Sequence, residues 1–322
     1  MDIDATVAAL MAERKGILFA DEGTDAENAR LARYELRDEE ARRAYRELLF
    51  TTPGIDAHLN GVIMSVETFA EKTEDGTSFA ELLRTKNILP GVVLDPFADD
   101  DALHTALAAN AALGATFAAF IADAPAPDGP VSDVLEKNTS ALAHAATRAL
   151  ASGLVPLIAL DTSPAGLHSA EKAEDEMLEA LSLLADALTK AGVDPAHVIV
   201  GTSMALSGAD VAAPADAREI AERTARAVTT ALPKEIGGVV FLSDSQTAEE
   251  ATENLNALAR LEPLPWPIAF CFLRALQDPV LETWQGNTEK FADAQAVFEN
   301  RLSLLSSADA AGYSPVEEND SF

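Results

Sequence analysis

The sequence is short of cysteine, of long apolar runs and of basic side chains. Cys271 is the only cysteine, so the chain cannot form an internal disulfide bond. No apolar run approaches the length that would span a bilayer. Residues 1–10 also lack the basic start and the apolar core of a secretory signal peptide. We therefore predict a soluble protein of the cytoplasm.

The shortage of basic residues leaves the chain strongly negative. It carries 53 acidic and 23 basic side chains, with a formal net charge of −30 at pH 7. Such a surface repels the phosphates of nucleic acids and of anionic membranes, so neither is an expected partner. The charge has two readings: a solubilising coat, as in proteins of a saline cytoplasm or with engineered surfaces, or a field that steers a cationic ligand.

The length and composition fit one large globular body. The chain has 322 residues, of which 48% are hydrophobic and 24% charged, a balance that supports a full core. No linker rich in Pro, Gly and Ser divides it, and the segment at 124–130 (APAPDGP) reads as a loop. We predict a single barrel domain over residues 1–311 and a flexible, acidic C-terminal tail over residues 312–322.

Eight apolar runs rich in Val, Ile, Ala and Leu recur along the chain, and helical patterns separate them. The runs lie at residues 16–22, 59–67, 89–95, 115–123, 153–161, 197–205, 236–244 and 266–274. The helical patterns lie at residues 38–50, 101–113, 132–151, 169–191, 215–232, 247–261 and 287–306. Strand and helix repeated eight times predict the α/β class and a (β/α)8 TIM barrel, whose chemistry occurs at the C-terminal ends of the strands.

The histidines and the cysteine do not predict a metal site or a cofactor. The five histidines are scattered over strand starts, helical patterns and a loop, at His58, His104, His144, His168 and His197. Converging ligands for zinc are therefore not expected. Cys271 lies inside the eighth run and is expected to pack in the core.

Four motifs carry a family resemblance. They are RKGILFADE at 14–22, GVIMSVET at 61–68, GVVFLSDSQTAEEATENLNAL at 238–258 and FLRALQ at 272–277. In these motifs the chain resembles the class I fructose-bisphosphate aldolases, a (β/α)8 family, and the resemblance extends over essentially the whole chain. It implies the aldol reaction of that family, in which a lysine at the end of the sixth strand forms a Schiff base with the substrate.

At the positions where the resemblance implies charged catalytic groups, this sequence has apolar residues. Ala205 stands at the position of the Schiff-base lysine, Val93 and Ala119 at those of two further lysines, Ile121 at that of an arginine and Ala159 at that of the catalytic glutamate. An alanine cannot attack a carbonyl. The resemblance therefore predicts that Schiff-base cleavage has been lost.

Some polar positions of the family pattern remain. The resemblance assigns substrate positioning and proton transfer to Asp21, a supporting carboxylate to Asp161, and phosphate contacts to Arg30, Ser243 and Arg274. Three glycines of the phosphate sites are replaced, by Asp244, Ser245 and Leu273. A carboxylate beside a phosphate weakens binding by like-charge repulsion, so a bisphosphate is not the expected ligand.

The four aspartates that end predicted strands, Asp21, Asp95, Asp161 and Asp244, could surround one mouth of the barrel. There they could share protons, hold a cation or bind an amine, or they could cap the following helices and pair with Arg30 and Arg274. An apolar pocket could lie between them, lined by Met64, Val93, Ala119, Phe120, Ile121, Ala159, Met204, Ala205 and Leu273. The same residues could instead fill the mouth as closed core.

Two classes of function therefore stay open. The chain binds or transforms a small molecule at the barrel mouth, as a lyase or isomerase that uses Asp21 and Asp161 as general acid and base. Alternatively it is a non-catalytic pseudoenzyme or scaffold, which could form homo-oligomers through its helix faces. Retained aldolase activity through an unrecognised amine is a further alternative. The chain ends in Phe322, where the family usually has a tyrosine, so tail-assisted proton transfer is not expected.

Overall fold

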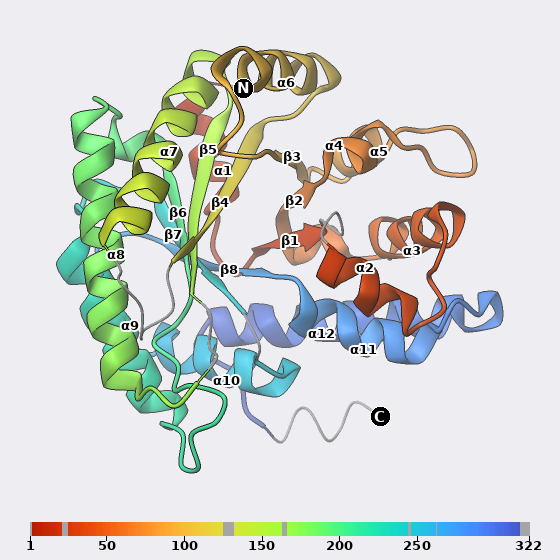
Figure 1. The fold of residues 1–322 in the computed structure, drawn as a ribbon. Coiled ribbons are helices and arrows are strands. Elements are labelled where there is room, and N and C mark those ends of the chain that lie inside the picture. The colour runs from red at the N-terminus through yellow and green to blue at the C-terminus, as the bar shows by residue number, and fades with distance from the viewer. Residues whose placement is uncertain are drawn as a thin grey trace.

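A closed barrel of eight parallel strands forms the centre of the protein, in a computed structural model that describes residues 2–20, 25–124, 132–162, 166–243, 246–261 and 263–315 (Figure 1). The strands are β1 (Gly16–Ala20), β2 (Leu59–Met64), β3 (Leu89–Val93), β4 (Phe117–Ala124), β5 (Val155–Thr162), β6 (Ile199–Thr202), β7 (Gly238–Leu242) and β8 (Ile268–Phe272). Each pairs in parallel with the next, and β8 pairs with β1. The predicted (β/α)8 TIM barrel is confirmed.

The described helices surround this barrel (Figure 1). The α-helices are α1 (Ile3–Leu10), α2 (Asp25–Ala32), α3 (Glu39–Thr51), α4 (Val66–Ala70), α5 (Phe79–Thr85), α6 (Asp100–Leu113), α7 (Ser132–Ala151), α8 (Ala170–Lys190), α9 (Ala217–Ala231), α10 (Ala248–Ala259), α11 (Arg274–Trp284) and α12 (Phe291–Asp309). Short 3₁₀ turns are η1 (Ile55–Ala57), η2 (Pro195–His197) and η3 (Thr288–Lys290).

Local capping chemistry sets several of these helix starts. The Ser169 side chain accepts a hydrogen bond from the backbone of Lys172 and begins α8. Thr247 and Glu250 form a reciprocal capping box at the start of α10, as their spacing predicts. The Ser65 side chain accepts a hydrogen bond from the backbone N–H of Thr68 and begins α4, so β2 ends at Met64 and the predicted extension of this strand to residue 67 is wrong.

Helix α1 closes the N-terminal end of the barrel. Its Val7 and Leu10, with the following Met11, pack among the side chains that point into the barrel. The Nδ2 of Asn60 donates hydrogen bonds to the carbonyl oxygens of Leu10 and Ala12, at 3.0 and 2.8 Å. These bonds tie the end of α1 to β2, and the helix leaves only the C-terminal end of the barrel as an open mouth.

The buried apolar residues form an inner and an outer layer. The outer layer lies between strands and helices, and the inner layer fills the barrel. In the lower half of the barrel the ring of Phe117 takes the space beside Gly91, where a Cβ would approach the ring to 2.2 Å. A side chain at Gly91 would therefore collide with this ring, and the lower barrel is packed core.

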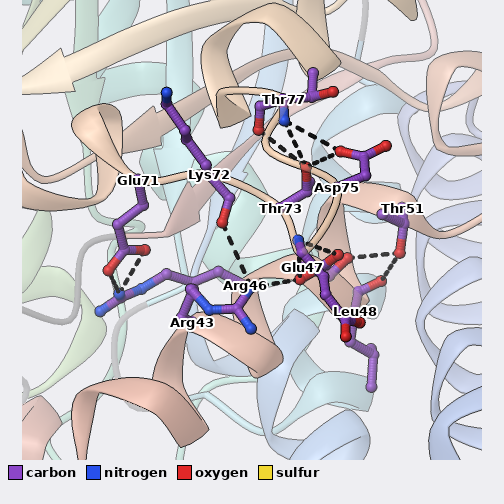
Figure 2. Close-up of polar contacts among 11 residues, drawn as sticks. Arg43, Arg46, Glu47, Leu48, Thr51, Glu71, Lys72, Thr73, Asp75 and Thr77 are labelled. Atoms are coloured by element: carbon purple, nitrogen blue, oxygen red, sulfur yellow. Dashed lines mark hydrogen bonds and ion pairs between the residues drawn. The ribbon is translucent and has the colours of Figure 1, made fainter.

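A buried arginine fixes the connection between α4 and α5 onto α3 (Figure 2). One guanidinium nitrogen of Arg46 donates to both carboxylate oxygens of Glu71, at 2.8 and 2.9 Å, and to Glu39 at 2.7 Å. The hydrogen bond from Arg46 lowers the pKa of Glu39, whereas burial raises the pKa of Glu71 despite the same arginine. The turn that follows is closed by Thr73 and Asp75, which bond to Thr77.

The chain is still packed beyond α12. The ring of Tyr313 is 1% exposed, and its carbonyl oxygen accepts hydrogen bonds from Asn256 and Arg260. Residues 316–322 lie outside the described part of the chain, so the division into a barrel and a tail stays a prediction. None of the helices in the described ranges is both long and apolar enough to cross a membrane.

Candidate functional site at the barrel mouth

Four apolar side chains line the inner wall of the barrel near the C-terminal ends of the strands. They are Phe19 of β1, Val93 of β3, Ile121 of β4 and Leu242 of β7. Each packs on the inner layer and is nevertheless partly exposed. Since a side chain inside a barrel meets solvent only through an open end, these residues mark the floor of an apolar mouth.

Two alanines lie directly below this floor on neighbouring strands. Ala119 pairs with Leu157, and Ile121 pairs with Ala159, in the parallel register of β4 and β5. Both alanines are fully buried in the inner layer. Gly201 of β6 is the register partner of Ala159, and a Cβ on Gly201 would lie only 2.8 Å from the Cβ of Ala159, so the adjacent strand presents no side chain beside this alanine. The resemblance implies charged groups at both alanine positions, and the inner wall here is apolar.

Other residues of the predicted pocket lie on the opposite side of the strands. Met64 and Phe120 belong to the outer layer and are fully buried there, so the prediction that they line the mouth is wrong. Met204 and Ala205 also pack with the outer layer, beyond the end of β6. The backbone N–H of Ala205 donates to the Thr224 hydroxyl oxygen at 2.9 Å.

Two carboxylates lie side by side at the top of β4 and β5. Asp123 and Asp161 are register partners on adjacent strands. Each follows an inward-facing residue by two positions, Ile121 and Ala159, and alternation along a strand gives it the same direction. Asp123 is exposed and Asp161 partly exposed. Asp123 is not among the site residues predicted from the sequence, although its spacing of two residues from Ile121 within one strand is the signal that identifies it.

The remaining strand-end aspartates differ in their surroundings. The Asp95 carboxylate accepts a hydrogen bond from the backbone N–H of Phe97 at 2.8 Å, so it stabilises the turn after β3, whereas the following helix α6 is capped by Asp99. Asp21 and Asp244 lie outside the described residues. The structure therefore brings Asp161 together with Asp123, and gives Asp95 a local role in the turn.

Arg30 is buried in a polar network between α2 and α11. Its guanidinium bonds to Glu27, to Asp278 and to the side-chain oxygen of Gln277, the last at 3.0 Å. Burial acts to lower the pKa of Arg30, but the charges of Tyr45, Glu27 and Asp278 together raise it. Three acceptors that belong to the protein thus already surround this guanidinium.

The same network reaches the barrel through Gln277, which is fully buried. Its Nε2 donates to the carbonyl oxygen of Phe19 at 3.0 Å, and its Oε1 also accepts from the Tyr45 hydroxyl at 3.3 Å. The end of β1 is therefore held by α11. The other two predicted phosphate contacts lie near by in the fold: Ser243 follows β7 and is buried, and Arg274 begins α11 and is exposed.

Every lysine of the chain lies outside the eight strands. The lysines are Lys15, Lys72, Lys86, Lys137, Lys172, Lys190, Lys234 and Lys290. Lys15 lies at the N-terminal end of the barrel, where its Nζ donates to the carbonyl oxygen of Asp56 at 2.6 Å. Lys137 is on the mouth side, with its Nζ 5.5 Å from the centre of the Phe97 ring. No strand of the barrel thus supplies an amine to its interior.

Three of the five histidines make structural contacts, and the cysteine is buried. His58, His144 and His197 contact Ser306, Asp100 and Asp4 respectively. Within the described ranges, no three His, Cys, Asp or Glu side chains are grouped so that they could hold a metal ion. Complete burial raises the pKa of the Cys271 thiol to about 12, so this thiol is not a nucleophile near neutral pH.

The family pattern covers nearly the entire chain. The sequence model described as "Fructose-bisphosphate aldolase class-I" matches residues 2–321. The chain belongs to the class I fructose-bisphosphate aldolase family. This confirms the resemblance seen in the sequence motifs, and the barrel architecture agrees with it.

Individual members of the family are about one-third identical to this chain. A probable fructose-bisphosphate aldolase class 1 of Xanthomonas axonopodis pv. citri is 35% identical over 312 residues, which cover 92% of this chain and 93% of the relative. The cytosolic fructose-bisphosphate aldolase 5 of Arabidopsis thaliana is also 35% identical, over 95% of this chain and 90% of its own.

A solved structure shares the fold over nearly the full length. The fructose-bisphosphate aldolase of Plasmodium falciparum, solved in complex with TRAP and a small-molecule inhibitor, aligns with a TM-score of 0.91 at 31% identity. The alignment covers 97% of this chain and 95% of the Plasmodium protein. Chain topology is thus shared with this aldolase over nearly the full length.

Proposed function

We propose that this protein has lost Schiff-base aldol cleavage and uses its barrel mouth for a different small molecule, one that is not a bisphosphate. The observation that carries the proposal is the inner wall: Val93, Ala119, Ile121 and Ala159 point into the barrel where the resemblance implies charged groups. Without an amine on any strand, the barrel interior has no group to form an iminium with a carbonyl substrate.

The charges around the mouth favour a ligand with an apolar body and a cationic or hydrogen-bond-donating end. Phe19, Val93, Ile121 and Leu242 offer partly exposed apolar contact. Above them Asp161 and its register partner Asp123 place negative charge at the strand ends. Two carboxylates side by side repel an anionic phosphate and attract an ammonium group.

In the catalytic form of this proposal, Asp161 and Asp21 exchange protons with the bound molecule. A carboxylate pair can act as general acid and general base when the two groups titrate differently. This chemistry corresponds to a lyase or an isomerase that acts without a covalent amine intermediate. It requires no metal or organic cofactor.

A binding survey tests this function. The full-length protein is titrated with apolar primary amines, neutral sugars and sugar phosphates, and binding is measured by calorimetry and by the shift in melting temperature. We expect amines to bind and fructose 1,6-bisphosphate not to bind. The Asp161→Asn variant should lose most of the affinity, whereas Asp186→Asn, at an exposed position on the outer face of α8, should bind as wild type. Binding confined to sugar phosphates would contradict the proposal.

Two alternatives are separated by further observations. A pseudoenzyme or scaffold, assembled into homo-oligomers through its helix faces, would bind none of these compounds. Retained aldolase activity would need an amine near the mouth, and Lys137 is the lysine whose position by Phe97 favours it. In that case the wild type would cleave fructose 1,6-bisphosphate and Lys137→Ala would not, while the matched variant Lys190→Ala at the far end of α8 would retain cleavage.

A further inference from the structure

Four of the six large apolar side chains that the described residues expose lie on one sector of the mouth. They are Val66 (42% exposed), Phe97 (47%), Val134 (53%) and Leu167 (74%), which we call the apolar rim. The other two lie towards the N-terminal face of the barrel: Leu113 is the last residue of α6, and Leu261 follows the end of α10. A soluble protein that exposes apolar groups together on one face commonly uses them to bind a partner.

The topology places the apolar rim over adjacent units of the barrel. Its members follow β2, β3, β4 and β5 in turn, and these strands are neighbours in the barrel. The helices after these strands also pack in sequence, α4 on α6, α6 on α7 and α7 on α8. Lys137 links two members directly: its ammonium lies over the ring of Phe97, and it is three residues after Val134 on the same face of α7.

Negative charge surrounds these apolar side chains. The segments 65–68, 94–101, 132–137 and 166–172, which carry the apolar rim, contain eight acidic and two basic residues. The acidic residues are Glu67, Asp95, Asp99, Asp100, Asp101, Asp133, Glu136 and Glu171, and the basic ones are Lys137 and Lys172. Asp100 is paired with Arg148, so the other seven carboxylates carry the excess of negative charge. A cation already occupies one side of the Phe97 ring, so the surface provides both the charge and the aromatic contact that bind basic side chains.

We propose that the apolar rim is a docking surface for a basic, amphipathic segment of a partner protein, with apolar residues on one face and Lys or Arg along its edges. A second copy of this chain does not fit, since it would bring another acidic rim and a further net charge of −30 against the first. Charge complementarity instead selects a basic chain, and the exposed apolar side chains select an amphipathic one. The inference does not depend on what binds inside the mouth.

A labelled helical peptide of about 18 residues built from Leu and Lys tests the proposal by fluorescence anisotropy with the full-length protein. We expect saturable binding that weakens as salt is raised. The Phe97→Ser/Val134→Ser variant should bind at least about tenfold more weakly, because it removes two apolar contacts from the centre of the surface. The matched Leu113→Ser/Leu261→Ser variant should bind as wild type, and circular dichroism should show both variants folded.

Three results would overturn the proposal that the apolar rim is a docking surface for a basic segment. A peptide of Lys and Ser with the same charge could bind equally well, which would show attraction to net charge alone. The Phe97→Ser/Val134→Ser variant could bind the Leu and Lys peptide with the same affinity as the wild type or as the matched control. Finally, sedimentation could show that the wild type self-associates and that the rim variant does not, which would make the occupant a second copy. The survey of mouth ligands uses different compounds and different variants. Failure of the docking surface and failure of the proposed function would therefore be seen in separate experiments.

Discussion

The buried Arg30 network predicts a large loss of stability when its central cation is removed. The Arg30 side chain is 5% exposed, and its carboxylate partners Glu27 and Asp278 are 13% and 38% exposed. In the Arg30→Met variant a residue of similar length keeps much of the packing. Both carboxylates and the Gln277 oxygen lose their contacts with the guanidinium.

The magnitude follows from these exposures. Removing one partner of a fully buried ion pair costs roughly 3–5 kcal/mol. Asp278 can regain water at its exposed edge, which reduces the cost, so we expect Arg30→Met to lower the free energy of unfolding by about 2–3 kcal/mol. Arg37 forms a matched pair with Glu35 in which the two side chains are 68% and 64% exposed. Arg37→Met should therefore lose no more than about 0.5 kcal/mol.

Urea unfolding of the wild type and both variants, followed by circular dichroism, measures the difference. We expect a lower urea midpoint for Arg30→Met, with an unchanged slope of the unfolding free energy against urea concentration. Equal midpoints for Arg30→Met and Arg37→Met would refute the structural role of this network. Tighter binding of inorganic phosphate by the wild type than by Arg30→Met would instead show that the guanidinium is available to an anion.

Three further predictions concern buried groups. Because burial raises its pKa to about 12, Cys271 should resist a maleimide at about pH 8 in the native state and react once the chain is unfolded; fast native labelling would disprove its burial. Burial also lowers the pKa of His58, an effect that Glu299 partly opposes, so the folded state binds fewer protons there and stability should fall as pH drops from about 7 towards 5. Melting temperatures should show that His58→Gln flattens this fall, and an unchanged pH profile would count against it. Ala205→Lys should melt at lower temperature, because it places an amine at a fully buried position, and a coupled cleavage assay should detect no aldolase turnover, since Ala119 and Ala159 remain apolar; turnover at the rate of a functional relative would show that one amine suffices.

Much of the fold could be predicted from the sequence because parallel barrel strands are buried on both faces. Each therefore reads as a continuous apolar run, and the helices between them begin at recognisable caps such as Thr247 with Glu250. Helix α1 was missed because its role depends on the tertiary contacts of Val7 and Leu10 inside the barrel. Helix α11 was missed because Pro279 lies within it, where proline usually breaks a helix.

The site was harder to predict because a continuous apolar strand hides which side chains face inward. Met64 and Phe120 carry the same apolar signal as Ile121, yet they point to the outer layer. Side chains alternate along a strand, so the direction of one side chain fixes the direction of all the others. Once Ile121 is known to point inward, Asp123 must point inward as well. Two of the three partners of Arg30, Asp278 and Gln277, lie more than 240 residues away in the sequence, so only the folded structure could bring them together.

The central claim is that no amine in this barrel forms an iminium with a ketose phosphate. The most direct measurement is the intact mass of the protein after sodium borohydride is added in the presence of dihydroxyacetone phosphate, with the cytosolic aldolase 5 of Arabidopsis thaliana treated in parallel. The account predicts an unchanged mass for this protein. A covalent adduct at one lysine, located by peptide mapping, would contradict it.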